Sequence, residues 1–141
     1  MNQIRKRMAA AVLLCFATCA TAIAAEHGHH QDKHHWTAEK GLYKVSHTSA
    51  LQPIEINRIH EWVLHIETAD GEPVENAVIT IDGGMPAHNH GLPTSPRVTE
   101  YLGDGNYRAE GFRFHMKGHW QIRITIEDDG NVDTAVMNMS L

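Results

Sequence analysis

Short stretches in which apolar and polar residues alternate are the feature that most restricts the fold of this chain. The clearest covers 120–127, where a tryptophan and three isoleucines alternate with polar residues. The stretches 62–67 and 77–82 show the same period of two, which puts successive side chains on opposite faces of a β-strand. Weaker patterns of this kind occur at 42–46, 97–102, 106–114 and 131–139, without a convincing helical period anywhere. The sequence therefore predicts an all-β protein.

Turn-forming residues separate these stretches. They are Asp70-Gly71, Gly103-Asp104-Gly105-Asn106 and Asp128-Asp129-Gly130-Asn131, which favour hairpin connections. About seven short strands with such turns are typical of an antiparallel, immunoglobulin-like β-sandwich. Tyr107 opens a predicted strand directly after Gly105-Asn106, the position expected for a tyrosine corner. A small β-barrel is the alternative architecture.

The first 24 residues have the pattern of a cleavable signal peptide. Arg5, Lys6 and Arg7 precede an apolar stretch over 8–19, and Ala22-Ile23-Ala24 is a typical cleavage motif. The apolar stretch is too short for a transmembrane helix, which needs about 20 residues. We therefore expect an exported, periplasmic protein that keeps no membrane anchor after cleavage.

The composition of the expected mature chain excludes several classes of protein. From Ala25 onward it has nine basic and seventeen acidic residues, a formal net charge of −8, which argues against binding to nucleic acids or anionic membranes. Cys15 and Cys19 both lie in the signal peptide. Without them the mature protein has no disulfide, no thiolate nucleophile and no cysteine-based metal site. All twelve histidines remain.

Residues 25–41 are polar and contain five histidines, with Trp36 as the single residue able to anchor them to a core. We interpret this segment as a disordered leader that precedes a domain over 42–141. Cleavage after Ala24 would leave a free amine on Ala25 and a histidine, His27, in third position. The amine, two backbone amides and the His27 imidazole could then bind Cu(II) or Ni(II) in a square plane. The alternative is a histidine-rich segment without defined stoichiometry, to which His29, His30, His34 and His35 contribute weak sites.

The long loop over 83–96 carries the residues with the richest chemistry. Its sequence, GGMPAHNHGLPTSP, contains Met85, His88 and His90. If each strand of the sandwich reverses direction, this loop lies at the same end as the turn at 115–118, two strands later. That turn supplies His115 and Met116.

A set of imidazole and thioether ligands without a thiolate favours copper as the metal. Thioether sulfur suits Cu(I), and imidazole suits both oxidation states. Zinc is possible as well, although it gains little from methionine. The sequence thus predicts a metal site formed by Met85, His88, His90, His115 and Met116 or by some of them. In the alternative interpretation, both methionines cover the core and the histidines are solvated.

The remaining histidines of the domain are weaker candidates. We expect His65 on the solvent face of its strand and His60 to be half-buried and hydrogen-bonded. His47 and His119 are possible additional ligands at the loop end.

Catalytic arrangements have less support. A triad built from Ser95, Asp82 and a histidine lacks a nucleophile elbow and oxyanion donors. A catalytic zinc on His88, His90 and His115 is harder to exclude, but no general base accompanies these residues. We expect the protein not to be an enzyme.

From Pro73 to Ile126 the sequence resembles the YtkA-like or FixH-like domains of bacterial exported and membrane-anchored proteins. The specific points of resemblance are Gly84-Met85-Pro86, His88-x-His90-Gly91, Pro93-Thr94, Tyr107 and Phe114-His115-Met116-x-Gly118-x-Trp120. This resemblance implies an immunoglobulin-like sandwich and a setting of copper handling or oxidase assembly. FixH-type proteins keep a membrane anchor, whereas this chain is expected to be released. The predicted metal ligands are therefore chosen from the residues of this chain and are not transferred from the family.

These features together predict a periplasmic copper-binding protein that acts as a carrier or buffer in copper homeostasis or oxidase metallation. Its partners would be the metal ion and a copper-receiving periplasmic or membrane protein. The lack of cysteines suits an oxidising compartment. The competing hypothesis is a metal-free β-sandwich that serves as an interaction module.

Overall fold

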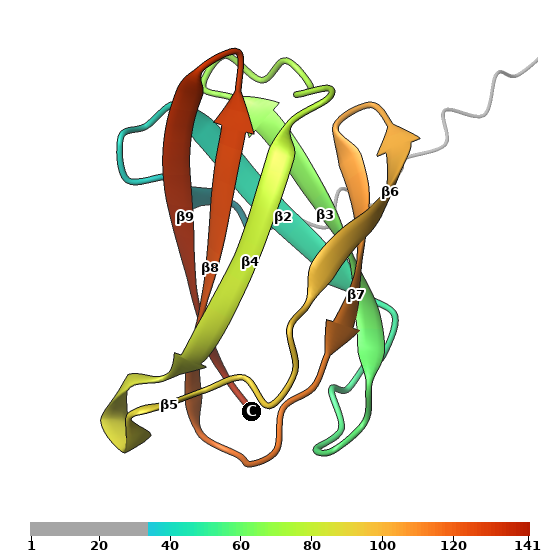
Figure 1. Ribbon diagram of the computed structural model, residues 1–141, viewed down its shortest axis with the longest axis vertical. Helices are drawn as coiled ribbons and strands as arrows, with labels where there is room; N and C mark the ends of the chain where they lie inside the picture. The colour runs from blue at the N-terminus through green and yellow to red at the C-terminus, as the bar shows by residue number, and fades with distance from the viewer. Residues whose placement is uncertain (1–33) are drawn as a thin grey trace, which may run out of the picture.

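The computed structural model describes residues 34–141 (Figure 1). The predicted signal peptide, His27 and most of the predicted leader lie outside these residues. The elements in order are β1 (Trp36–Thr37), β2 (Tyr43–Ser49), β3 (His60–Thr68), β4 (Val78–Met85), the 3₁₀ helix η1 (Pro86–His88), β5 (His90–Gly91), β6 (Arg97–Gly103), β7 (Asn106–Phe112), β8 (His119–Asp128) and β9 (Asn131–Ser140). Within 34–141, no helix has the length and apolar character needed to cross a bilayer.

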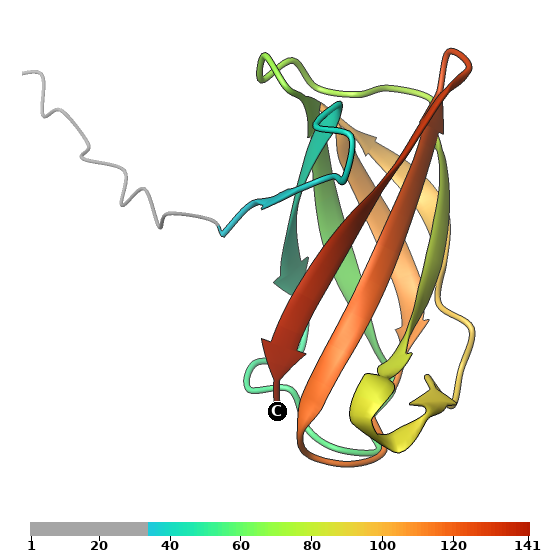
Figure 2. The ribbon, with the colours of Figure 1, turned by 90° about the vertical axis from the view of Figure 1, so that its left-hand side faces the viewer.

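The strands form two antiparallel sheets that face each other (Figures 1 and 2). One sheet has the order β1-β2-β3-β7-β6 and the other β5-β4-β8-β9. The seven longer strands correspond to the seven predicted stretches, while β1 and β5 are additional two-residue strands. The predicted all-β sandwich is therefore confirmed.

The core lies between the sheets and follows directly from the alternating pattern. Trp62 and Leu64 on β3 and Trp120 and Ile122 on β8 are fully buried, because each occupies the inward parity of its strand. The Trp62 ring stacks on Phe112 of the neighbouring strand, with ring centroids 4.0 Å apart. Burial of such large aromatic side chains supplies much of the favourable free energy of folding.

Tyr107 forms the predicted tyrosine corner. Its hydroxyl donates a hydrogen bond of 2.7 Å to the carbonyl of Val74 and accepts one of 3.2 Å from the Ala77 amide. Burial raises the pKa of Tyr107, so the hydroxyl stays protonated and able to donate. The corner ties β7 to the connection that leads into β4.

The ordered domain begins earlier than the expected boundary at residue 42. Trp36 and Thr37 pair with Val45 and Lys44 of β2. Beyond them, the Glu39 amide donates a 2.9 Å hydrogen bond to the Thr134 carbonyl on β9. The polar composition of this segment concealed the strand, because only Trp36 marks it as part of the sandwich.

Asp133 fastens this segment to the second sheet. Its buried carboxylate accepts hydrogen bonds from the backbone amides of Lys40, Leu42 and Thr134. Burial raises the pKa of Asp133, but these amide donors, with Lys40 nearby, outweigh it and hold the pKa below its usual range. The carboxylate is therefore charged and paired where the two sheet edges meet.

His47 supplies a testable consequence of the fold. It continues the inward parity of β2 and lies against Trp62, with ring centroids 4.1 Å apart. Burial lowers the pKa of His47 to about 4, whereas an unfolded histidine titrates near 6.5. The unfolded state therefore takes up a proton that the folded state cannot, so the free energy of unfolding should fall by about 3 kcal/mol between about pH 6.5 and about pH 4.

Urea unfolding measured over this pH range tests the prediction. His47→Phe keeps an aromatic ring beside Trp62 and should remove most of the pH dependence. His119→Phe, at an exposed position, is the control and should leave it in place. An unchanged pH slope in His47→Phe would show that another group carries the effect.

Candidate metal centre

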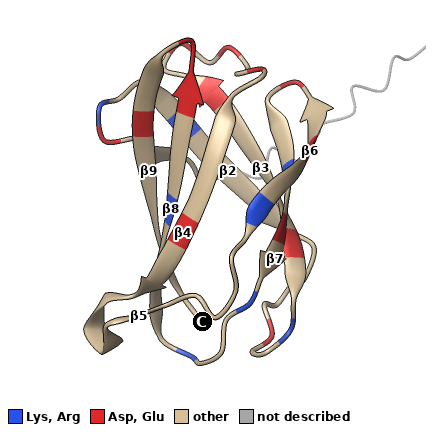
Figure 3. Ribbon diagram, in the orientation of Figure 1, with Lys and Arg blue, Asp and Glu red and all other residues tan. Residues whose placement is uncertain are grey.

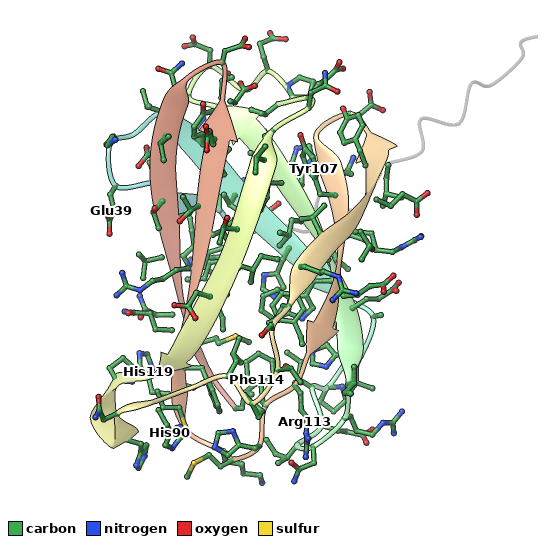
Figure 4. The ribbon with its side chains drawn as sticks, viewed as in Figure 1. Glu39, His90, Tyr107, Arg113, Phe114 and His119 are labelled. Carbon is green, nitrogen blue, oxygen red and sulfur yellow. The ribbon has the colours of Figure 1, made fainter. Side chains whose placement is uncertain are left out.

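The loop after β4 and the turn before β8 meet at one end of the sandwich, as the alternation of strand direction predicts. The rings of His90 and His115 have centroids 4.8 Å apart, and those of His88 and His90 are 5.7 Å apart and nearly parallel. Figure 4 shows His90 and Phe114 at this end and Tyr107 towards the other. Three of the predicted ligands, from two separate segments, are thus brought together.

A close approach between backbones positions His90. The chain leaves β4 at Met85, turns through η1 and returns as β5, where His90 pairs with Met85 and Gly91 with Gly84. A Cβ atom on Gly84 would lie 2.5 Å from the His90 carbonyl oxygen, so glycine is required there. Asn89 makes the reversal in the left-handed conformation, with φ of 51°, which asparagine tolerates.

Trp120 holds the turn that carries His115. Its indole N–H donates a 3.1 Å hydrogen bond to the Met116 carbonyl. Its ring also meets Phe114 and His115 edge to face, at centroid distances of 5.1 Å and 5.4 Å. Sequence reasoning did not assign Trp120 to the site. Its inward parity on β8, directly after the turn, is the signal that could have done so.

One nitrogen of His115 has no partner. Its Nδ1 is buried and makes no hydrogen bond, which is uncommon for a buried polar atom. With metal–nitrogen bonds of about 2 Å, two imidazoles on one tetrahedral ion have ring centres about 5 Å apart. The 4.8 Å spacing of His90 and His115 agrees with that distance. The spacing of the pair therefore fits a shared metal ion, as it also fits an ordinary contact between two rings.

The two methionines differ in their access to this pair. Met85 is 1% exposed and lies beneath the turn, where a Cβ on Gly118 would be 2.7 Å from its terminal methyl. Met116 is half-buried and packs against the edge of the core. Met85 thus has the position of a core residue, as in the alternative interpretation, while Met116 stays closer to solvent.

The ligands are not arranged as a finished site. Among residues 34–141, no three His, Cys, Asp or Glu side chains converge closely enough to hold a metal ion. His88 and His90 are both exposed. Their side chains can rotate in solvent, and a shallow hollow lined by Asn89, Gln121 and Arg123 opens beside His90. Coordination by all three imidazoles would require rotation of exposed side chains and no change in the sheets.

The other histidines lie mostly as predicted. His60 is 9% exposed and hydrogen-bonds the Arg58 carbonyl through Nδ1, at 3.1 Å. His65 is half-buried on the outer face of β3, with Nδ1 3.2 Å from the Asn106 side chain. His119 is exposed at the start of β8. His47 is directed at Trp62 on the inner face of its sheet, which makes it a poor additional ligand for the loop.

Comparisons with known proteins agree with this architecture. A search of curated proteins finds no match. Among solved structures, the crystal structure of a DUF4426 family protein from Pseudomonas aeruginosa PAO1 is similar. It shares 18% identity with a TM-score of 0.50, over 72% of this chain and 89% of that chain. At this identity the likeness concerns the fold alone.

The sequence model of the YtkA-like family matches residues 49–125. This range runs from the end of β2 into β8 and contains both the loop and the turn that meet at the histidine cluster. The match covers more than half of the chain, so the protein belongs to the YtkA-like family.

Proposed function

We propose that this protein binds copper outside the cytoplasm and acts as a carrier or buffer rather than as a catalyst. The site is the cluster of His88, His90 and His115, with Met116 as a possible fourth ligand. The observation that carries the proposal is the 4.8 Å approach of His90 to His115, whose buried Nδ1 has no partner. Two segments far apart in sequence present imidazoles to the same small volume.

The charge distribution supports a late transition metal. Neither 83–96 nor 111–126 contains an Asp or Glu, although the chain has seventeen acidic residues. Figure 3 shows the β5 loop without acidic residues. Hard cations such as calcium and magnesium require oxygen ligands. Imidazole with a nearby thioether is a ligand set that suits copper.

Met85 and the loop histidines differ in burial and therefore in their role at the site. Met85 is enclosed beneath Gly118, so it supports the turn, while the imidazoles of His88 and His90 are exposed. Coordination dominated by imidazole suits copper in both oxidation states, and zinc remains a competitor. A carrier needs ligands that can release the ion, and the exposed His88 and His90 meet that requirement.

Export and delivery complete the proposal. The predicted signal peptide would send the chain to the periplasm, where a ligand set without cysteine is not lost to disulfide formation. The copper would pass to a periplasmic or membrane protein that docks at the open loop end.

A metal-free interaction module is the second candidate. The observation that favours it is that the described residues hold no converged group of three protein ligands. Under this hypothesis the histidines are solvated loop residues.

Copper titration of the mature chain separates the two candidates. Replacing His27, His29, His30, His34 and His35 by alanine first removes binding by the N-terminal segment. We expect this variant to bind copper tightly, at about one equivalent. The further double change His88→Ala and His90→Ala should weaken binding at least about a hundredfold, because the loss of a group that only supports a ligand already costs about 10- to 100-fold and here two ligands are lost.

The matched control is His65→Ala with His119→Ala, which removes two imidazoles outside the cluster. Circular dichroism should show that both double variants stay folded, since His88, His90 and His119 are exposed and His65 lies on the outer face of its sheet, away from the core. Equal copper affinity in the two double variants would eliminate the assignment, and no binding by the starting variant would favour the interaction module.

Acidity provides a separate prediction. Imidazole ligates only when neutral, so Cu(II) affinity should fall steeply as the pH drops from about 7 to about 5. A thioether does not titrate, so a contribution from Met116 would make Cu(I) affinity fall less steeply. Competition titrations with a chelator of known affinity measure both slopes. A pH-independent Cu(II) affinity would contradict imidazole ligation.

The predicted amino terminus adds one more expected outcome. If the mature chain begins at Ala25, it should bind one Cu(II) in a square plane through the terminal amine, two amides and His27. Visible absorption of the mature chain with Cu(II) should show the spectrum of a square-planar complex. His27→Ala should abolish this spectrum, whereas His29→Ala should not. Mass spectrometry establishes the terminus, and an Ala25 terminus without a His27-dependent spectrum would refute the chelate.

A further inference from the structure

The two ends of the sandwich differ in charge. The end away from the histidine cluster includes 69–76, 103–105 and 127–130, which contain seven acidic residues and no basic residue. Figure 3 shows acidic residues along the turns at the top of the view. Lys40 and Lys44, around the start of β2, are basic residues at this end. Even with these two lysines, the end carries a large excess of negative charge.

The end with the histidine cluster has the opposite balance. Its connections, 50–59, 86–96 and 113–118, contain three basic residues and one acidic residue. The acidic residue, Glu55, forms an exposed ion pair with Arg58, with 3.0 Å between the carboxylate Oε2 and the guanidinium Nη1. The two other basic residues both lie in 113–118, the turn that contributes to the candidate metal centre.

Arg113 and Lys117 flank His115 and Met116 in this turn. Nη2 of Arg113 donates a 3.1 Å hydrogen bond to the side-chain oxygen of Asn57, which orients the guanidinium, and Figure 4 shows Arg113 at the cluster end. Lys117 is exposed. Among the described residues, no carboxylate forms an ion pair with either side chain. Both positive charges are therefore available to a partner.

We propose that the copper-receiving partner docks on this turn through an acidic surface. Its carboxylates pair with Arg113 and Lys117, and a guanidinium can bind a carboxylate through two parallel hydrogen bonds. Because the two cations lie on either side of the candidate ligands, docking brings the partner's own metal ligands next to the ion. The identity of the cargo rests on the proposed function, whereas the docking of an acidic surface does not require bound copper.

Local charge outweighs net charge at this end of the molecule. The expected mature chain has a formal net charge of −8, which repels an acidic partner at long range. The ten residues of β8 separate the two ends by about 33 Å, whereas charges are screened beyond about 8 Å at physiological ionic strength. A partner at the turn therefore responds to Arg113 and Lys117. The acidic end disfavours docking in the reverse orientation.

An anionic membrane is the other acidic surface that these two cations could meet. Basic clusters that recognise anionic lipids typically contain about four to eight lysines and arginines. The turn supplies two. This number suits a protein surface, which can place one carboxylate opposite each cation.

Metal-free protein and a synthetic acidic peptide test the docking directly. The probe is hexaglutamate, and the readout is the shift of backbone amide signals in NMR spectra of the mature chain. We expect hexaglutamate at low ionic strength to shift the amides of 113–118 until they saturate, and added salt to weaken the binding. No shift in this turn at low ionic strength would overturn the proposal.

Two double variants with the same net charge provide the matched comparison. Arg113→Gln with Lys117→Gln should weaken hexaglutamate binding about fivefold, because two exposed ion pairs are lost. Lys40→Gln with Lys44→Gln removes two charges at the acidic end and should leave the affinity unchanged. Thermal unfolding checks that both proteins are folded. Equal affinities of the two double variants would overturn the proposal.

Two further measurements separate this inference from its alternatives. Vesicles of phosphatidylglycerol should not sediment the protein at physiological ionic strength. Sedimentation that Arg113→Gln with Lys117→Gln abolishes would replace the protein partner by a membrane and overturn the proposal. His88→Ala with His90→Ala should bind hexaglutamate as the unchanged chain does. Copper titration therefore decides the proposed function, and the amide shifts decide the docking surface.

Discussion

Trp120 is the residue on which both the core and the candidate site depend. Its ring is fully buried between the sheets, while its indole N–H fixes the carbonyl of Met116 in the turn above. The same ring supports His115 from one side, and His90 lies 6.4 Å away. The packing of Trp120 in the core therefore also sets the position of the imidazoles. A change in how Trp120 packs would displace the turn that brings His115 to His90.

Much of the fold could be predicted because two simple rules decide it. Alternating side chains such as Trp62 and Leu64 need an inner and an outer face. The turns at Asp104-Gly105 and Asp129-Gly130 return the chain to an adjacent antiparallel strand, whereas Asp70-Gly71 leads from β3 towards β4 in the other sheet. The tyrosine corner at Tyr107 follows from its position after such a turn. Strand reversal then places the loop and the turn at one end, which is why the sequence alone predicts that His90 and His115 lie together.

Other features escape prediction because the strands run past the ends of their alternating sequence patterns. β4 continues through two glycines to Met85, so this residue keeps the inward parity of Ile81 and becomes part of the core. β2 likewise continues past its predicted end, which turns His47 inward. The pairing of Trp36 with Val45 depends on a turn fixed by Asp133, a contact more than ninety residues distant in sequence. No local pattern reveals such a contact.

The central claim is that the imidazoles of the loop and the turn bind one ion together. Imidazole ¹⁵N spectra recorded during an Ag(I) titration test it most directly, in the mature chain with its five N-terminal histidines replaced. The account predicts that the ring nitrogens of His90 and His115 shift together and reach saturation at about one equivalent. His65, on the outer face of β3, should not respond at that point. Independent shifts of His90 and His115, or none at all, would contradict the claim.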